Sequence, residues 1–545
     1  MPVVTLYLSR LQKLVGKASK HKIIDALPFL GLDIEEQTEE YVKVEYSPNR
    51  PDYATDVGIA TGLQGLLGIK KGIAKLVIKK QKDKNYSIKT DPAVKKIRPY
   101  ILGLIAKGGK LDDESIRQLI ALQEDLHFGV GRKRKKASIG IHNLDAIKLP
   151  LFYTAKSIDH KFTPLATNAE MSAKQILESM DVGKEYSAIL GNGHSVSMIL
   201  DAQGNTISFP PIINSALTTV SASNVNLLVE VTGSDLGAVS DTLSVIASAL
   251  QGLGFTLYDL KTDTKSSADS LKTRTIPLNS SLVNQTLGLE LSPAQICNML
   301  KKCRLDATMR GKKISCTVPS YRFDIFGPMD LVEEVALGYG IQNLSPTLPS
   351  SVSVGQKSKI TLKLDSLSQI MIGLGFTEAL NSSLTSKQVL YDDTRRDPTK
   401  LIEVSESKSK EHTVLRDSIL PGLLENLSKN IHEQYQQKLF ETGVVFSGDS
   451  PIKESISLAC VSAHRDSGYT EIKSILQSLL KTDSNIECYT KTSSNSMFAR
   501  GKTADIMIHN KKVGTIGEID SQVIENFKIR VPVSGFELLL TDFII

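Results

Sequence analysis

Residues 318–340 read VPSYRFDIFGPMDLVEEVALGYG, and this stretch is more informative about the fold than any other part of the chain. Pro328 suits the first turn of a helix, where a missing N–H group needs no partner. Asp330, Glu333 and Glu334 follow at positions i, i+3 and i+4, so three carboxylates share one helical face. Asp324 precedes the helix closely enough to fold back toward them. The stretch therefore predicts a helix with an acidic face.

Two interpretations of these four acids are open. Converging carboxylates repel one another, and a hard cation such as Mg²⁺ would relieve that repulsion. Acids in the first turn of a helix also favour the positive end of the helix dipole, with no metal required. The spacing alone does not choose between a metal site and a stabilised helix end.

Around this stretch, residues 271–345 read as a compact unit of strand, helix, strand and helix. Helices are expected at 292–302 and 329–337, with a strand at 313–318 between them. Two polar segments read as linkers on either side, 261–270 and 345–358.

The rest of the chain mixes strands and helices. Strands are expected at VVTLYL near the N-terminus and at 41–46, and a helix begins just after Asp52, which can cap it. Residues 207–235 read as two strands joined by a polar loop. The last third reads as a large antiparallel sheet flanked by helices. We therefore predict an α+β, multidomain protein.

The composition is that of a globular protein, with 545 residues of which 41% are hydrophobic and 23% are charged. No stretch approaches the ~20 apolar residues of a membrane span, and the N-terminus lacks the pattern of a signal peptide. The five cysteines are scattered and form no C-x-x-C pair, as expected for reduced thiols. We expect a cytoplasmic protein with no membrane partner.

Basic residues exceed acidic ones by 65 − 59 = 6, which does not identify a nucleic-acid-binding protein. Their distribution is more informative, because lysines and arginines cluster at 70–89, 132–136 and 301–313. Such clusters either follow a phosphate backbone or form solvated faces. The sequence does not say which cluster contacts RNA.

The stretch 318–340 resembles the signature of the phenylalanyl-tRNA synthetase beta-subunit family, of the archaeal and eukaryotic type, within the class II aminoacyl-tRNA synthetases. Other segments resemble the same family in the same order along nearly the whole chain: 47–68, 137–145, 414–430, 438–446 and 514–519. No single segment is decisive, but the ordered set is specific.

The resemblance implies four domains. They are a small N-terminal α+β domain at 1–85, a central mixed editing domain (tRNA-binding, B3/B4-like) at 86–262, a small magnesium-binding α+β domain (B5-like) at 271–345, and a class II synthetase-like module with an antiparallel sheet at 355–545. It also implies that Asp324, Asp330, Glu333 and Glu334 bind Mg²⁺ at a contact shared with an alpha subunit.

The C-terminal module is expected to be pseudo-catalytic. A class II core holds the ATP α-phosphate with an arginine beside a motif glutamate, because guanidinium makes bidentate contacts to phosphate. Residues 439–442 read LFET around Glu441 and residues 514–518 read GTIGE, and neither segment contains an arginine. ATP and phenylalanine would then bind to the alpha subunit of a complex of two alpha and two beta chains, which also binds the phenylalanine tRNA.

The central domain is expected to hydrolyse tyrosine wrongly attached to that tRNA, since an apolar pocket rejects one extra hydroxyl only weakly. From the resemblance, Glu230 and Thr232 recognise the amino acid and position water, while Asn214 and Ser215 face the terminal adenosine. Ser208 is a further pocket residue. Archaeal relatives often have aspartate where this chain has Glu230, so the acid here has a different reach. Structural roles are the alternative for the serine and threonine residues, because hydroxyl groups near strand ends also satisfy local backbone groups.

Three histidines, His127, His142 and His160, receive no catalytic role, because a lone histidine near a strand end is usually structural. The expected function is the beta subunit of phenylalanine–tRNA ligase, with editing in the central domain. Two alternatives stay open: a free-standing deacylase of mischarged tRNA, and a tRNA-binding scaffold without hydrolytic activity.

Overall fold

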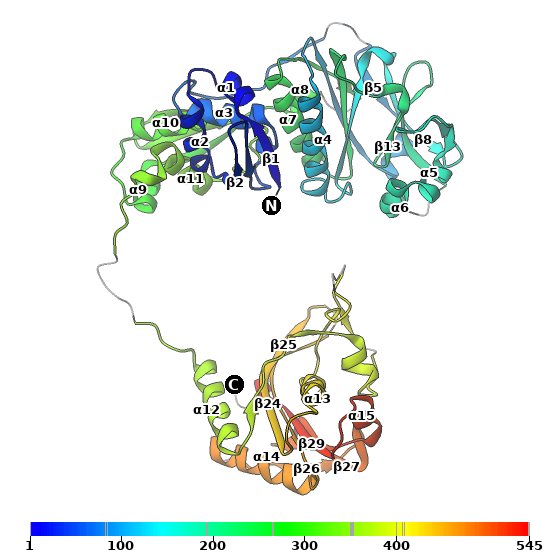
Figure 1. Cartoon of the computed structure of the whole chain (residues 1–545), viewed down its shortest axis with the longest axis vertical. Helices are drawn as coiled ribbons and strands as arrows, with labels where there is room; N and C mark the ends of the chain where they lie inside the picture. Colours follow the sequence, from blue (N-terminus) through cyan, green and yellow to red (C-terminus); the bar gives the residue numbers. More distant parts are fainter. Residues whose placement is uncertain are drawn as a thin grey trace. The chain divides into compact units, whose positions relative to one another are not determined.

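A computed structural model describes residues 2–81, 83, 85–191, 194–263, 266–348, 354–398, 401–405, 407, 409–448, 450–484 and 486–542. The chain forms two compact units, Met1–Leu348 and Pro349–Ile545, which are described separately (Figure 1). Both combine helices and strands, so the mixed α+β, multidomain class is confirmed. The four-domain boundaries stay a prediction, and part of the expected linker 345–358 lies outside the described residues.

Unit 1 begins with a three-stranded antiparallel sheet in the order β1-β3-β2. In β3, Val42 and Val44 are buried while their neighbours are half-exposed, so the alternation gives one core face. Three helices accompany the sheet. The bounds are β1 Val3–Tyr7, α1 Leu8–Val15, α2 Lys20–Ala26, β2 Asp33–Gln37, β3 Tyr41–Glu45 and α3 Asp56–Leu66.

The helix expected just after Asp52 starts later than predicted. Helix α3 begins at Asp56, and the Thr55 side chain caps it by accepting a hydrogen bond from the Gly58 N–H. The Asp52 carboxylate instead accepts two hydrogen bonds from Arg50, at 2.9 and 2.8 Å. Hydrogen bonds from the charged Arg50 guanidinium are stronger than those from backbone N–H groups. The Asp52 carboxylate therefore pairs with Arg50, and Thr55 caps the helix.

The central part of unit 1 contains a five-stranded sheet, β4-β15-β6-β14-β7, and a six-stranded sheet, β13-β12-β11-β8-β5-β16. Leu228 and Ile105 of the first sheet pack with Tyr153 and Ile199 of the second in one apolar core. Helices α4 (Asp113–Phe128) and α7 (Leu236–Gly252) contact the five-stranded sheet. Figure 1 shows this part in light blue to green.

The strands of the central sheets have these bounds: β4 Ile78–Lys79, β5 Ser87–Thr90, β6 Tyr100–Lys107, β7 Ala137–Asn143, β8 Leu151–Ser157, β11 Ser195–Leu200, β12 Thr206–Phe209, β13 Ile213–Asn214, β14 Asn226–Gly233, β15 Thr256–Asp259 and β16 Lys261–Thr262. Residues 207–235 thus hold three strands where two were expected. The segment 261–270 is also more than a linker, because β16 pairs with β5 and Ser267 is fully buried.

Unit 1 ends with a three-stranded antiparallel sheet in the order β17-β19-β18, covered by three helices. The bounds are β17 Arg274–Asn279, α9 Ser280–Leu287, α10 Pro293–Lys302, β18 Asp306–Arg310, β19 Lys313–Val318 and α11 Pro328–Tyr339. The two helices and the strand predicted around residues 292–337 are confirmed to within two residues at each end.

Unit 2 is built on a seven-stranded sheet in the order β20-β24-β25-β29-β28-β27-β26. All pairs are antiparallel except β20 with β24. Leu458 and Cys460 belong to one apolar core and the alternating Ala459 and Val461 to another, so helices cover both faces. The large antiparallel sheet flanked by helices is confirmed.

The bounds in unit 2 are α12 Lys359–Gly373, β20 Thr377–Glu378, β21 Leu384–Thr385, β22 Ile402–Glu403, β23 Val414–Leu415, α13 Leu420–Lys429, β24 Gln437–Ser447, β25 Lys453–Ala463, α14 Tyr469–Ser484, β26 Tyr489–Thr492, β27 Phe498–Ile508, β28 Lys511–Ile519, α15 Ser521–Asn526 and β29 Val533–Leu539. Across the described parts of both units, every helix is too short or too polar to cross a membrane.

Candidate functional site

A cavity of about 770 Å³ lies in the central part of unit 1, between α4, the strands β7 and β14, and the β12–β13 turn. This volume is within the range of small-molecule sites. Most of the lining is apolar, and includes Ile116, Leu119, Ile139, Leu165, Ile212, Val220 and Leu227. Such walls suit an aromatic side chain or another apolar group.

Four of the five predicted editing residues line this cavity: Ser208, Asn214, Ser215 and Glu230. Ser208 and Asn214 are opposite one another across β12 and β13, and the Ser208 hydroxyl donates to Asn214 Oδ1 at 3.2 Å. The Ser215 hydroxyl donates to the Thr163 carbonyl at 3.3 Å. A short hairpin therefore gathers three polar side chains at one wall.

Glu230 is the buried acid of the cavity, with 1% of its surface exposed. Its Oε2 atom has no hydrogen-bond partner among the described residues. Its Oε1 atom is 3.8 Å from His142 Nε2, too far for a hydrogen bond, and that nitrogen also lacks a partner. A buried acceptor without a donor is unfavourable, so this carboxylate favours a ligand or water that donates to it.

Gly140 makes the space for this pair. It faces Glu230 across β7 and β14. A methyl group at Gly140 would lie 2.5 Å from Glu230 Oε1 and 2.5 Å from His142 Nε2, closer than real contacts allow. A glycine inside a strand often marks such a close approach.

Thr232 is placed differently from the prediction, since it is not part of the cavity lining. Its hydroxyl accepts a hydrogen bond from Arg98 Nε at 3.0 Å and shares one with Ser138 at 3.1 Å. Burial lowers the pKa of Arg98 to about 10, and the guanidinium stays charged at neutral pH. Thr232 therefore links Arg98 to Ser138 of β7, and its predicted part in editing stays a prediction.

Arg134, from the basic cluster 132–136, also holds the cavity together. Its guanidinium donates to the carbonyls of Pro211 and Ile212 at 3.2 and 3.0 Å, and it lies over the Tyr186 ring at 4.5 Å. It further donates to Glu124 of α4 at 3.2 Å. Arg134 therefore ties the β12–β13 turn to α4 across the cavity wall.

The three histidines have structural partners. His127 Nε2 accepts a hydrogen bond from the Ile139 N–H at 2.9 Å, and burial lowers the pKa of this ring. His142 Nδ1 is 2.8 Å from the Thr218 hydroxyl, and His160 Nε2 is 2.8 Å from the Thr206 hydroxyl. Of the three, His142 alone has a ring nitrogen facing Glu230.

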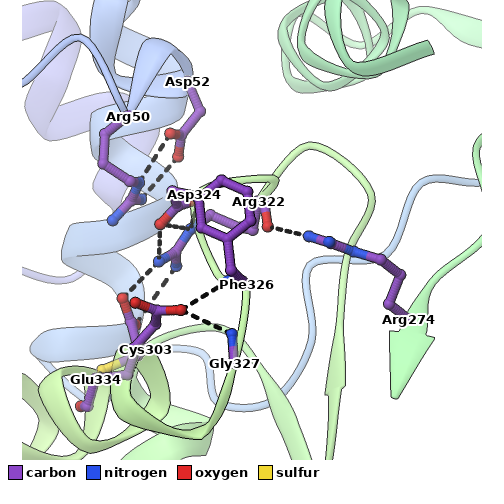
Figure 2. Close-up of polar contacts among 10 residues, drawn as sticks. Arg50, Asp52, Arg274, Cys303, Arg322, Asp324, Phe326, Gly327 and Glu334 are labelled. Carbon is purple, nitrogen blue, oxygen red and sulfur yellow. Dashed lines mark hydrogen bonds and ion pairs between the residues drawn. The ribbon is translucent and has the colours of Figure 1, made fainter. Parts of the chain in front are cut away.

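The acidic quartet does not converge in this chain. Arg322 lies between two of its members: it donates to both oxygens of Asp324, at 2.9 and 2.8 Å, and to Glu334 at 2.5 Å (Figure 2). Asp330 accepts hydrogen bonds from the N–H groups of Phe326 and Gly327, at 2.7 and 2.8 Å.

Glu333 points away, since it is exposed while Glu334 is buried on the adjacent helical position. Burial raises the pKa of Asp324, but the charge and hydrogen bonds of Arg322 outweigh it, and the net shift is downward. Within the described residues, no group of three or more His, Cys, Asp or Glu side chains is arranged to hold a metal. Arg322 therefore supplies a positive charge beside Asp324 and Glu334, and magnesium binding by the quartet stays a prediction.

Glu441, which the resemblance places in a class II motif, is fully buried. Although segments 439–442 and 514–518 contain no arginine, Arg416 directly after β23 donates to Glu441 Oε1 at 2.6 Å and to the Val444 carbonyl at 3.0 Å. Asn381 donates to the other carboxylate oxygen at 2.7 Å. The guanidinium is engaged inside the protein and is not presented to a ligand.

Two family models match the chain. Residues 276–341 match the model described as the tRNA synthetase B5 domain, and residues 344–540 match that of the phenylalanyl tRNA synthetase beta chain CLM domain. These matches define the class of protein, a component of an aminoacyl-tRNA synthetase.

Curated relatives extend the match to the whole chain. The phenylalanine–tRNA ligase beta subunit of Archaeoglobus fulgidus is 37% identical over 100% of this chain and 99% of its own length. The beta subunit of Methanocaldococcus jannaschii is 36% identical over 99% of this chain and 100% of its own length. The chain belongs to the phenylalanine–tRNA ligase beta subunit family.

A solved structure agrees with this assignment. An N-terminal fragment of the phenylalanyl-tRNA synthetase beta subunit from Pyrococcus horikoshii has a TM-score of 0.59 and 30% sequence identity. The similarity covers 62% of this chain and 99% of that fragment.

Sequence reasoning missed several residues that shape the cavity or the surroundings of the acidic quartet. Arg98 carries no local motif, and its contact with Thr232 spans 134 positions. Gly140 could have been found, because it interrupts the strand sequence ASIGIH. Arg322 stands two residues before Asp324, where its charge was a visible signal.

Proposed function

We propose that this chain is the non-activating beta subunit of a phenylalanine–tRNA ligase, and that it also edits tyrosine from mischarged tRNA. In this proposal an alpha subunit binds ATP and phenylalanine, and two alpha and two beta chains assemble with the phenylalanine tRNA. Family membership and the internal pairing of Arg416 with Glu441 support the division of labour, since this guanidinium is not available to a phosphate.

The observation that carries the editing proposal is the unpartnered Oε2 atom of Glu230 in an apolar cavity. The hydroxyl of a tyrosine ring would donate a hydrogen bond to it. A phenylalanine ring cannot, and would leave the buried carboxylate unpaired at a cost of about 1–3 kcal/mol. The cavity therefore discriminates in the direction that an editing site needs.

The reaction is hydrolysis of an ester. Water attacks the carbonyl carbon, the bond to the ribose oxygen breaks, and free tyrosine and the tRNA hydroxyl result. Ser208, Asn214 and Ser215 lie together on one wall and offer hydroxyl and amide groups for the terminal ribose and adenine. Thr232 acts as a positioning residue, because it hydrogen-bonds to Arg98 and to Ser138, which lines the cavity.

Magnesium and ATP belong to the assembled complex in this proposal. Asp324 and Glu334 are both paired with Arg322, so a magnesium ion at this surface would rely mainly on Asp330, Glu333 and ligands from the alpha subunit. No step of the proposed editing reaction is routed through the metal. Equilibrium dialysis of the chain alone should show no stoichiometric Mg²⁺ binding, and tight binding would contradict this arrangement.

Two measurements test the function. The purified chain alone should show no phenylalanine-dependent ATP–pyrophosphate exchange, whereas the complex with the alpha chain should; robust exchange by the chain alone would refute the division of labour. In the complex, Glu230→Gln should slow deacylation of tyrosyl-tRNA at least about tenfold, as expected for the loss of about 1.4 kcal/mol, and leave phenylalanylation unchanged.

A matched control is Glu178→Gln, which alters an exposed glutamate of the same central part. An unchanged deacylation rate in Glu230→Gln would favour a tRNA-binding scaffold without hydrolytic activity. Full deacylation by the chain without its alpha partner would favour a free-standing deacylase.

A further inference from the structure

Two of the three basic clusters of the sequence meet in the structure. The Gly72 N–H donates to the Lys301 carbonyl at 2.8 Å, and the Ala74 N–H donates to the Arg304 carbonyl at 3.2 Å. The segment after α3 therefore lies against the end of α10. Gly65 permits the approach, because a methyl group there would lie 2.0 Å from the Lys302 carbonyl.

The charge at this junction is strongly positive. Segments 68–75 and 301–306 contain six basic side chains (Lys70, Lys71, Lys75, Lys301, Lys302 and Arg304) and one acidic side chain, Asp306. Lys70, Lys71 and Lys75 are exposed and have no ion-pair partner among the described residues. Lys301 and Lys302 are half-exposed.

Contacts within the described part of the chain account for the positions of Lys301 and Lys302, but not for those of Lys70, Lys71 and Lys75. Lys302 donates to the Gly338 carbonyl at 3.0 Å, Lys301 is 3.8 Å from Asp306, and both end α10, where cations favour the helix dipole. The three lysines of the 68–75 loop have no such role. Their charge is unbalanced locally and attracts a polyanion.

The third basic cluster is different, because it is largely engaged within the chain. Arg134 binds the carbonyls of Pro211 and Ile212, and Lys136 pairs with Asp235 at 3.1 Å. Lys133 and Lys135 also have partners. The structure thus separates a structural cluster at 132–136 from an available one.

We propose that the surface formed by Lys70, Lys71, Lys75, Lys301 and Lys302, here called the basic seam, binds the phosphate backbone of the tRNA. The inference rests on the proposed function, which supplies tRNA as the polyanion. Lysine ammonium groups are point charges without the planar fork of arginine, and they suit contact that positions a backbone without reading its bases.

The test is the salt dependence of tRNA binding by the complex with the alpha chain, in wild type and in the variant Lys70→Ala/Lys71→Ala/Lys75→Ala. Each contact to a phosphate contributes about 0.7 to the slope of log Kd against log salt. The slope should therefore fall by about 2, and Kd near 0.1 M salt should rise about a hundredfold.

The control variant Lys387→Ala/Lys481→Ala/Lys528→Ala removes the same charge from three exposed lysines of unit 2 and should leave the slope unchanged. A second variant, Lys70→Arg/Lys71→Arg/Lys75→Arg, should keep the wild-type slope. An unchanged slope in the alanine variant, or an equal loss in the control, would overturn the proposal. Wild-type complex that fails to charge tRNA would instead refute the proposed function, whatever the slope.

Discussion

Replacing Arg322 by methionine should destabilise the end of unit 1 strongly. The Arg322 side chain is 4% exposed, and it lies between Asp324 and Glu334, whose side chains are 11% and 7% exposed. Methionine keeps an apolar side chain of similar length but leaves two buried carboxylates without a cation. Removing one partner of a buried ion pair typically destabilises the folded state by about 3–5 kcal/mol, and we expect a loss in that range.

The expected loss depends on pH. Because the net shift lowers the pKa of Asp324, its pairing contributes stability above the unfolded pKa of about 3.8 and loses it as pH falls through the folded value. In Arg322→Met this carboxylate remains buried without a cation, and acid neutralises it. The difference between wild type and variant should therefore be largest near neutral pH and shrink toward about pH 4.

The assay is hydrogen exchange of the backbone amides of α11, together with thermal unfolding of the full chain. Arg395→Met is a matched control, because Arg395 makes an ion pair with Asp520 in which its own side chain is 50% exposed. That control should lose less than about 1 kcal/mol. A loss below about 1 kcal/mol in Arg322→Met, or a loss independent of pH, would refute the view that Arg322 neutralises buried acids.

Three further outcomes are expected. Gly140→Ala would place a methyl group 2.5 Å from Glu230 Oε1. This overpacking should destabilise the fold by about 1–3 kcal/mol, lower the melting temperature and slow tyrosyl-tRNA deacylation. Gly373→Ala is the control and should do none of these, because its added methyl group meets no atom within 4 Å. Arg98→Met should reduce kcat for deacylation more than it changes KM, since Arg98 is not among the residues that line the cavity. A raised KM with an unchanged kcat would contradict this. Arg416→Met should destabilise unit 2 by about 3–5 kcal/mol, measured by urea unfolding, and should not create ATP–pyrophosphate exchange.

Elements with a strong local pattern were predictable from sequence. The strand at 313–318 was found as β19, Lys313–Val318, and the helix at 329–337 as α11, Pro328–Tyr339. Alternation of apolar residues and a proline in the first turn depend on near neighbours only, and sequence reports these directly.

Side-chain partners were less predictable. Asp52 was the predicted cap of α3, but Thr55 is the observed one, because the Asp52 carboxylate pairs with Arg50. Arg98, just before β6, donates a hydrogen bond to Thr232 across 134 positions of sequence. In each case the hydrogen-bond partner is a donor that lies within about 3 Å of the side chain in the folded protein. The periodicity of apolar residues carries no information about distances between side chains.

The acidic stretch 318–340 shows the same division. The helix, the spacing of its four acids and, through ordered motifs along the chain, the family could be read from the residues alone. That Glu334 faces the core, that Glu333 faces solvent, and that Arg322 lies between Glu334 and Asp324 depends on how the folded chain packs. Adjacent helical positions point about 100° apart, so packing on one side of α11 separates carboxylates that the spacing alone places together.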